Sequence, residues 1–464
     1  MGSMPKERES LGSRLGFVLL SAGCAIGLGN VWRFPFITGR YGGAAFVLMY
    51  LVFIVCFAMP VMVMEFAVGR ASRQSIIGSF KTLQPKGTGW SVFGYFGLAG
   101  NYVLMMFYTT VTGWMLAYTW RNVSGGLEGL TPDEIGAAFG GMLADPVGLT
   151  FWMFLAVALG FLVCGGGLQK GVERITKCMM GGLFLILIVL AARSVTLPGA
   201  EKGLDFYIKP NMERLLQNGV WETVYAALGQ SFFTLSLGIG SMAIFGSYIN
   251  KDRSLLGEAV VVTSLDTFVA LFAGLIIFPA CFAYGIEPNA GPGLIFVTLP
   301  NMFNSMPQGR IWSTLFFLFM TFAAMSTVVA VFELLIASFI DNLGWSRKKS
   351  CWFNFIAVFV LSIPCVLGFN LWSDFAPLGA GTIVLDLEDF IVSNNLLPLG
   401  SIVYLLFCSS RWGWGWDNFI KEANIGKGPK VPEGLRLYCA YFLPAVIGIL
   451  FIYGYVDIFA KFFK

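Results

Sequence analysis

Long runs of apolar residues alternate with short polar connections along almost the whole chain. An apolar run of about 17–20 residues is long enough to cross a bilayer as a helix. Eleven such runs are present, and each predicts a transmembrane helix: 15–38, 44–68, 91–120, 148–164, 178–195, 221–249, 256–284, 311–340, 351–370, 383–408 and 436–460. The pattern therefore predicts an all-α integral membrane protein.

Two of these runs are interrupted near their middle by glycine and small polar residues. The first contains residues 21–30 (SAGCAIGLGN), and the sixth contains residues 231–240 (SFFTLSLGIG). Hydrocarbon cannot satisfy free backbone N–H and C=O groups, so unwound helix persists only when it is buried in protein or lines a wet cavity. A matched pair of such breaks is typical of a transporter with its binding site near the bilayer midplane.

The two broken runs open two halves of comparable helix spacing. We expect residues 15–208 and 209–408 to be two five-helix repeats of inverted topology, because an odd number of spans turns the second repeat over. Residues 287–296 are too short to span and are predicted to form an outer hairpin lid. The remaining segments are predicted to be a cloning remnant (1–3), a cytoplasmic N-terminal segment (4–14), a cytoplasmic loop (409–434) and the eleventh helix with the C-terminus (435–464).

The composition narrows the possible chemistry. Hydrophobic residues make up 57% of the chain and charged residues 12%, with a mean hydropathy of +0.75, which excludes an ordinary soluble domain. The chain has no His, so His-based triads, haem ligation and the usual zinc sites are excluded. The nine Cys lie in or beside apolar runs without a CxxC pair and are interpreted as buried small hydrophobic residues.

The basic residues are distributed unevenly between the two sides of the predicted membrane. With the N-terminus inside, 20 of the 30 Lys and Arg fall in cytoplasmic segments. This asymmetry predicts a cytoplasmic N-terminus and, with eleven spans, an external C-terminus. The net charge of +4 therefore reflects membrane topology and gives no reason to expect nucleic-acid binding.

Several short motifs together resemble the neurotransmitter:sodium symporter family. They are residues 29–35 (GNVWRFP), 42–43 (GG), 65–70 (EFAVGR) and 230–236 (QSFFTLS). The likeness to bacterial amino-acid transporters of the leucine-transporter type covers the chain from about residue 6 to the tenth span, and the eleventh span fits as well. The resemblance implies discontinuous first and sixth helices that face substrate and ions.

Residue by residue, the resemblance implies two sodium sites and a substrate site at the breaks. For the second sodium site, helix packing by small polar residues is the alternative explanation of its two hydroxyl groups. The first sodium ion is expected at the Ala25 carbonyl, Asn30, Thr234 and Asp266, completed by the substrate carboxylate. The second is expected at the carbonyls of Gly23, Ile26 and Ala323 and the hydroxyls of Ser326 and Thr327. The expected substrate-binding residues are Cys24, Ala25, Gly29, Leu104, Tyr108, Phe233, Thr234, Ser236, Ile239, Thr327 and Val331.

Asp266 departs from the pattern of the family, which commonly has Asn at this position. Chloride-dependent relatives place a Ser one turn later, where this chain has Ala270. A fixed carboxylate can replace a bound anion, so the resemblance implies that chloride is not required. The alternative is a neutral, protonated Asp266 in a structural hydrogen bond.

The resemblance also implies two gates, each an ionic latch with two states. For their arginines, interfacial snorkelling is the alternative explanation. The outer gate is expected at Arg33, Asp389 and Gln230, and the inner gate at Arg8, Asp341, Ser247 and Tyr248. Glu65 is expected to tie the broken helices together through their backbone N–H groups.

The pocket residues favour an apolar amino acid as substrate. Leu104, Ile239 and Val331 form an aliphatic wall, while Gly27 stands where amine transporters of the family carry an Asp. The function expected from the resemblance is a sodium-coupled symporter that imports a hydrophobic or aromatic amino acid across a prokaryotic plasma membrane by alternating access. The alternatives are a carrier for glycine or a betaine, or an amino-acid sensor that does not transport.

Two further classes of protein are disfavoured by what the sequence lacks. A channel requires a continuous polar or charge-ringed pore, and no such ring is evident. No catalytic cluster is evident either, so an enzyme is not expected. No feature of the sequence specifies an oligomeric state.

Overall fold

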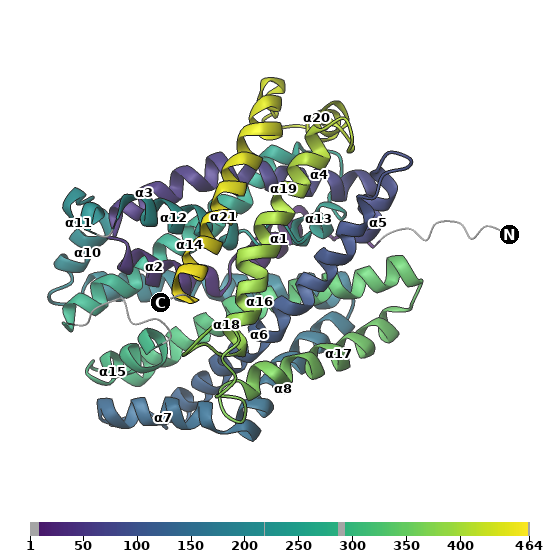
Figure 1. The fold of residues 1–464 in the computed structure, drawn as a ribbon. Helices are drawn as coiled ribbons and strands as arrows, with labels where there is room; N and C mark the ends of the chain where they lie inside the picture. Colours follow the sequence, from purple (N-terminus) through teal and green to yellow (C-terminus); the bar gives the residue numbers. More distant parts are fainter. Residues whose placement is uncertain (1–8, 218, 286–292, 463–464) are drawn as a thin grey trace.

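The computed structural model describes residues 9–217, 219–285 and 293–462 (Figure 1). These residues form helices and connecting turns without a β-strand, and a single isolated bridge joins Arg253 and Lys427. The predicted cloning remnant (1–3), Arg8 and most of the predicted hairpin lid lie outside the described residues.

The helices follow one another along the chain with short connections. In the first half they are α1 (Arg14–Ala25), η1 (Gly29–Arg33), α2 (Phe34–Arg40), α3 (Ala44–Phe53), η2 (Ile54–Ala58), α4 (Met59–Ser72), α5 (Ile76–Leu83), α6 (Ser91–Val123), α7 (Pro132–Ala144), α8 (Pro146–Gly165), η3 (Leu168–Glu173), α9 (Arg174–Val195), α10 (Glu201–Ile208) and α11 (Met212–Gln217). In the second half they are α12 (Val220–Thr234), α13 (Ser241–Gly246), α14 (Leu255–Ala283), η4 (Leu294–Thr298), α15 (Leu299–Asn304), α16 (Gly309–Leu343), α17 (Arg347–Leu367), α18 (Val384–Asp389), η5 (Phe390–Leu396), α19 (Leu397–Ser409), α20 (Trp416–Ala423), η6 (Glu433–Leu435), η7 (Tyr438–Phe442) and α21 (Leu443–Phe462).

Eight helical stretches of the described residues are long and apolar enough to cross a membrane, or nine if the bent pair α1 and η1–α2 counts as one span. This confirms an all-helical protein with membrane-spanning helices, whereas the count of eleven stays a prediction. Two of the eleven predicted runs are not among these stretches. The helix α6 is 33 residues long but rich in Gly, Thr and Tyr, and the sixth run is divided into α12 and α13.

The surface of the helix bundle carries many large apolar side chains. Val147 and Leu162 of α8 are 77% and 74% exposed, and Tyr441 near α21 is 72% exposed. An aqueous surface rarely presents so many contiguous apolar groups, whereas a lipid-facing surface does. The long helix α16 lies inside the bundle and packs against α1, α6, α8 and α9.

The first helix is broken in the middle of the bundle. α1 ends at Ala25, Ile26 is extended with φ −71° and ψ 96°, and the chain bends by 52° before it resumes as η1 and α2. Gly27 allows the unwound backbone to approach its neighbours closely. A Cβ atom at Gly27 would lie 2.3 Å from the Tyr108 hydroxyl oxygen, so a side chain here requires Tyr108 to move.

The sixth predicted span is also broken, by a run of left-handed residues. α12 ends at Thr234, and Ser236, Gly238 and Gly240 take positive φ values of 51°, 95° and 79° before α13 begins. Left-handed backbone favours glycine, which explains two of these three positions. Glu65 of α4 satisfies donors that the break frees, because its carboxylate accepts from the Gly238 N–H (2.5 Å) and the Met242 N–H (3.2 Å).

Candidate substrate and sodium site

A small cavity of about 20 Å³ lies between the two helix breaks. Nine of the eleven expected substrate-binding residues line it, whereas Thr234 and Val331 do not. A volume of this size accommodates about one water molecule, so the walls are drawn close together in this structure. The lining residues are Cys24, Ala25, Gly27, Gly29, Leu104, Tyr108, Phe233, Ser236, Ile239, Thr327, Val392 and Leu397.

Val392 and Leu397 were not expected from the sequence. They belong to η5 and to the start of α19, far along the chain from both breaks. The close packing of α19 against the second break brings them to the cavity, since a Cβ atom at Gly238 would lie 2.2 Å from the Leu397 carbonyl oxygen. No local motif marks these positions, because they are selected by packing between distant helices.

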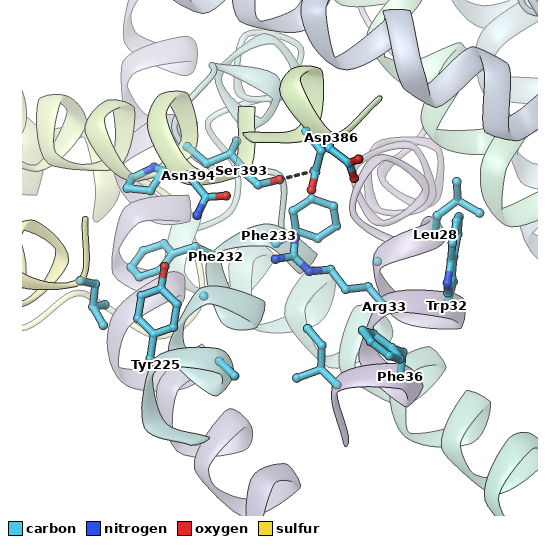
Figure 2. A pocket seen from close by; sticks show the side chains of 18 of the residues that line it. Leu28, Trp32, Arg33, Phe36, Tyr225, Phe232, Phe233, Asp386, Ser393 and Asn394 are labelled. Carbon is cyan, nitrogen blue, oxygen red and sulfur yellow. Dashed lines mark hydrogen bonds between the residues drawn. The ribbon is translucent and has the colours of Figure 1, made fainter. Parts of the chain in front are cut away.

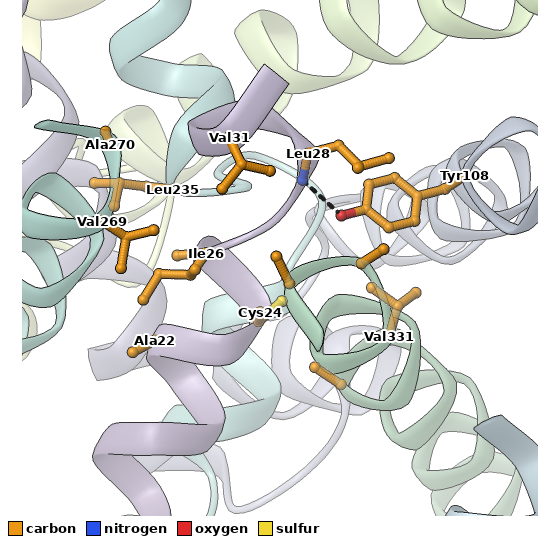
Figure 3. Close-up of a cluster of buried hydrophobic side chains, with 14 of the residues drawn as sticks. Ala22, Cys24, Ile26, Leu28, Val31, Tyr108, Leu235, Val269, Ala270 and Val331 are labelled. Atoms are coloured by element: carbon orange, nitrogen blue, oxygen red, sulfur yellow. Dashed lines mark hydrogen bonds between the residues drawn. The ribbon is translucent and has the colours of Figure 1, made fainter. Parts of the chain in front are cut away.

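Tyr108 and Phe233 close the cavity on the side of the first break. The Tyr108 hydroxyl accepts a hydrogen bond from the Leu28 N–H at 3.0 Å, as Figure 3 shows, and thereby satisfies one donor of the unwound segment. The Phe233 ring lies so near the backbone of the break that a Cβ atom at Gly29 would lie 2.9 Å from the ring. The Phe233 ring therefore packs directly against the backbone of the break at Gly29.

Three of the four residues expected at the first sodium site converge on one buried carboxylate. The Asn30 side-chain amide donates to Asp266 Oδ1 at 2.8 Å, and the Thr234 hydroxyl donates to Asp266 Oδ2 at 3.0 Å. The Asn30 Oδ1 atom accepts from the Gly27 N–H at 3.2 Å. The fourth residue, Ala25, is the last residue of α1 and lines the adjoining cavity. Carboxyl, amide and hydroxyl oxygen atoms are thus gathered where the break begins.

The residues expected at the second sodium site form a compact cluster of oxygen atoms. The Thr327 hydroxyl oxygen lies within 3.2–3.4 Å of four carbonyl oxygens, and the Ser326 hydroxyl lies 3.5 Å from one of these and 3.0 Å from another. A hydroxyl group has a single proton, so it can donate to one of these carbonyls at a time. An excess of acceptors over protons is typical of a hard-cation site. The four carbonyls belong to Gly23, Cys24, Ile26 and Ala323.

A larger cavity of about 520 Å³, called the vestibule below, shares Gly29, Tyr108, Phe233 and Leu397 with the small cavity. Figure 2 shows Arg33, Phe233 and Asp386 among the side chains that line the vestibule. Arg33 extends into it with its guanidinium 4.2 Å from the centre of the Phe233 ring. The vestibule also receives side chains from α12, α18, η5 and α21. Phe233 therefore separates a spacious cavity from a contracted one.

The residues expected at the outer gate all lie at the vestibule or beside it. Asp389 lines it and accepts from the Ser393 hydroxyl at 2.6 Å, while Gln230 donates to the Gly29 carbonyl at 3.0 Å. Arg33 and Asp389 form no ion pair within the part of the chain that the structure describes, and Arg33 Nη1 has no hydrogen-bond partner there.

The residues expected at the inner gate lie at the opposite end of the bundle, where α1 begins. Asp341 accepts from the Ser75 N–H at 2.6 Å, and the Ser247 hydroxyl donates to the Ile244 carbonyl at 2.5 Å. The hydroxyl of Tyr248 donates to Glu333 at 3.1 Å. Arg8 lies outside the described residues.

Glu333, which is buried, and Arg347, which is partly buried, form an ion pair that was not expected from the sequence. The Arg347 guanidinium bonds both carboxylate oxygens of Glu333, at 2.7 and 2.9 Å, and the Glu333 side chain is completely buried. A Glu within an apolar run is a signal of function in a membrane protein. Its partner was not identifiable in advance, since Arg347 begins the next helix.

Comparison with known proteins places the chain in a family. The family model described as "Sodium:neurotransmitter symporter family" matches residues 8–129 and 141–463 of this chain. The uncharacterized sodium-dependent transporter YhdH of Bacillus subtilis is 36% identical over 395 residues, which covers 85% of this chain and 86% of that protein. An uncharacterized sodium-dependent transporter of Haemophilus influenzae is 32% identical over 457 residues, with coverage of 96% and 98%.

A solved structure supports the same placement. The crystal structure of MhsT in complex with L-phenylalanine has a TM-score of 0.86 and 38% sequence identity, and it covers 96% of this chain and 99% of that one. The chain belongs to the sodium:neurotransmitter symporter family, whose members are transporters and not enzymes. The protein is therefore a sodium-dependent membrane symporter, which confirms the resemblance drawn from residues 29–35 and 230–236.

Proposed function

We propose that the protein imports a hydrophobic or aromatic amino acid together with sodium ions by alternating access. The observation that best supports this proposal is the cavity between the two helix breaks. Its apolar walls include Leu104, Ile239 and Val392, and the unwound backbone supplies polar groups. An amino-acid carboxylate requires N–H donors, and an apolar side chain requires a dry pocket. The complex of MhsT with L-phenylalanine supports this substrate class.

Two sodium ions are proposed, one at each oxygen cluster. The first is held by Ala25, Asn30, Thr234 and Asp266, and the substrate carboxylate completes its ligands. Neither partner then binds tightly alone, which couples substrate binding to sodium. The second is held by the cluster around Thr327, where the ion links the broken first helix to α16 and stabilises one arrangement of the two.

Alternating access follows from the proposed gates at the two ends. Arg33 and Asp389, with Gln230 beside them, close the outer end, while Asp341 with Ser247 and Tyr248 closes the inner end together with Arg8. We place the N-terminus in the cytoplasm of a prokaryotic cell, with eleven spans and two inverted repeats of five. The vestibule then faces the outside.

The test is substrate binding to the purified protein with each of the twenty amino acids, in sodium and in choline buffer. Thermal shift or scintillation proximity reports the binding. We expect several apolar and aromatic amino acids to compete, all with an affinity that depends on sodium. The proposal is wrong if glycine or a charged amino acid binds best, or if affinity is equal in the two buffers. Uptake into proteoliposomes separates a transporter from a sensor that only binds.

We further propose that Asp266 makes chloride unnecessary. Its carboxylate supplies the negative charge that a bound anion supplies in chloride-dependent relatives, and Ala270 offers no hydroxyl to an anion. Uptake by the wild type should not change when gluconate replaces chloride, whereas Asp266→Asn should either abolish uptake or make it sensitive to the anion. A strong chloride requirement of the wild type would contradict this assignment.

A further inference from the structure

Glu388 is a buried carboxyl group that neither the substrate site nor the sodium sites use. It is the residue before Asp389 in α18, and it is 3% exposed. Within the part of the chain that the structure describes, neither of its oxygen atoms has an N–H or O–H partner. A polar group in such a place is costly unless it is neutral or paired, and an ionised carboxylate is far more costly than a neutral acid.

Among the described residues, the surroundings of Glu388 offer only one weak donor, the Cys365 thiol, to stabilise a negative charge. α18 packs against α6 and α17, which present the Thr110 hydroxyl and the Cys365 thiol, and the thiol lies beside both Thr110 and Glu388. The Thr110 hydroxyl donates to the Met106 carbonyl at 3.2 Å. No Lys or Arg within the described ranges forms an ion pair with Glu388. The helix α18 itself carries two further carboxyl groups, those of Asp386 and Asp389, and no basic residue.

The carboxyl groups on the two faces of α18 lie in different surroundings. Asp386 and Asp389 line the vestibule, and each accepts a hydrogen bond, from the Ile383 N–H at 2.8 Å and from the Ser393 hydroxyl at 2.6 Å respectively. Glu388 points to the dry contact with α6 and α17 and accepts neither kind of bond. One short helix thus carries two carboxylates suited to water and one carboxyl suited to the neutral form.

We propose that Glu388 is a proton-binding site on the helix that carries the outer-gate carboxylate. The acid holds its proton while α18 is packed against α6 and α17. On release, which requires α18 to move so that water reaches the contact, the O–H bond breaks, the proton passes to that water, and the carboxylate keeps the electron pair. The charged form disfavours the dry contact and favours displacement of α18 toward the vestibule. The effect on transport rests on the proposed outer gate, because Asp389 is the next residue, whereas proton binding itself does not.

The sign of the pH effect follows from which form the contact accepts. Low pH favours the packed arrangement, and its stability falls as the pH rises through the range in which Glu388 loses its proton. Gln resembles the neutral acid in shape and cannot ionise. Glu388→Gln should therefore keep the packed arrangement at every pH and remove this component of the pH dependence.

The direct test is infrared spectroscopy of the purified full-length protein in lipid, titrated between acid and alkaline pH in sodium buffer without substrate. We expect the difference spectrum of wild type minus Glu388→Gln to contain one carbonyl band of a protonated carboxylic acid, which disappears as the pH rises; the subtraction removes bands of other buried acids such as Glu65 and Asp266. Glu222→Gln, which removes an exposed carboxylate of α12, is the control and should retain the band. An identical protonated-acid band in wild type and Glu388→Gln would overturn the proposal.

A second variant keeps the test decisive if Glu388→Gln folds poorly. Cys365→Ser replaces the weak thiol donor beside the carboxyl with a stronger hydroxyl donor, and a hydrogen bond to the ionised form favours ionisation. The band should then disappear at a lower pH than in the wild type, and an unchanged titration would contradict the assignment. Loss of the pH effect on thermal stability in Glu388→Gln, with sodium-dependent substrate binding intact, would separate this site from a failure of the proposed function.

Discussion

The two ends of the helix bundle differ in how their charged side chains are used. At the vestibule end, Arg33 contacts the Phe233 ring and forms no ion pair with Asp389 within the described residues, and a cavity of about 520 Å³ remains between the helices. At the end where α1 begins, the completely buried Glu333 bonds Arg347 through both oxygens and also accepts from Tyr248. Among the described residues, Arg33 and Asp389 are therefore not paired with each other at the open vestibule, whereas Glu333 and Arg347 are paired at the other end.

Further contacts hold the closed end together. The carboxylate of Glu173 in η3 accepts from the Gly12 N–H at 2.7 Å and from the Ser13 hydroxyl at 2.9 Å, which ties the start of α1 to η3. The buried Arg70 of α4 bonds Glu422 of α20 at 2.7 Å. The arrangement with an open vestibule is therefore stabilised mainly by contacts at the opposite end of the bundle. In alternating access, closing the vestibule must supply new pairs that offset those lost at the opposite end.

The largest expected effect is on the closed end. Arg347→Ala leaves the Glu333 carboxylate buried without its partner, and removal of one partner of a buried pair costs about 3–5 kcal/mol. We expect a strong decrease in thermal stability and opening of this end, measured by thermal unfolding. Arg310→Ala is the matched control, since its contact to Glu128 is 3.5 Å long and half exposed and should contribute less than about 1 kcal/mol. Equal losses in the two variants would contradict the comparison.

The next effect concerns the site between the two ends. Asn30→Ala removes an amide that bonds Asp266 and a proposed sodium ligand. A hydrogen bond to a charged group contributes about 1.5–3 kcal/mol, so the affinities for both sodium and substrate should fall by roughly ten- to a hundredfold. Binding isotherms measured over a range of sodium concentrations check this. A loss of substrate affinity with unchanged sodium affinity would show that the two do not share a site.

A smaller effect is expected in the side-chain pocket. Ile239→Phe adds volume to the wall of a cavity that is already contracted, so large substrates should be disfavoured relative to small aliphatic ones. A methylene of pocket fit contributes about 1–3 kcal/mol, which sets the expected change in relative affinity. Competition binding with Leu, Phe, Trp and Val measures it, and sodium dependence should persist. An unchanged order of affinities would place the side-chain pocket elsewhere.

The smallest effect on stability is expected at the open end. Arg33→Gln removes a contact with the Phe233 ring that contributes about 0.5–1 kcal/mol, because no ion pair to Asp389 is broken in this arrangement. Thermal unfolding should therefore change little, whereas uptake should fall because the vestibule loses its proposed latch. A loss of stability as large as that of Arg347→Ala would show that Arg33 is paired in the resting protein and would remove the asymmetry between the ends.

The helix breaks illustrate what could be predicted. The first run is interrupted at Ile26 and Gly27 and the sixth at Ser236, Gly238 and Gly240, within the glycine-rich strings that the sequence displays directly, whereas Gly23 stays inside α1 and Gly29 begins η1. Nine residues named from the resemblance then line one cavity in the structure. The number of membrane spans was harder to establish, because α6 is long enough to cross a membrane but its mean hydropathy is too low to identify it as a span.

The amino-acid sequence by itself determined that this chain is helical, lies in a membrane and is broken twice at glycines, because local hydropathy and backbone freedom are properties of short segments. It also carried the family motifs, which are local strings. Only the tertiary structure decided that Leu397 lines the substrate cavity and that Glu333 forms an ion pair with Arg347. It also decided that Glu388 is buried whereas the next residue, Asp389, lines the vestibule. These facts depend on which distant helices pack together, and packing is a property of the whole chain.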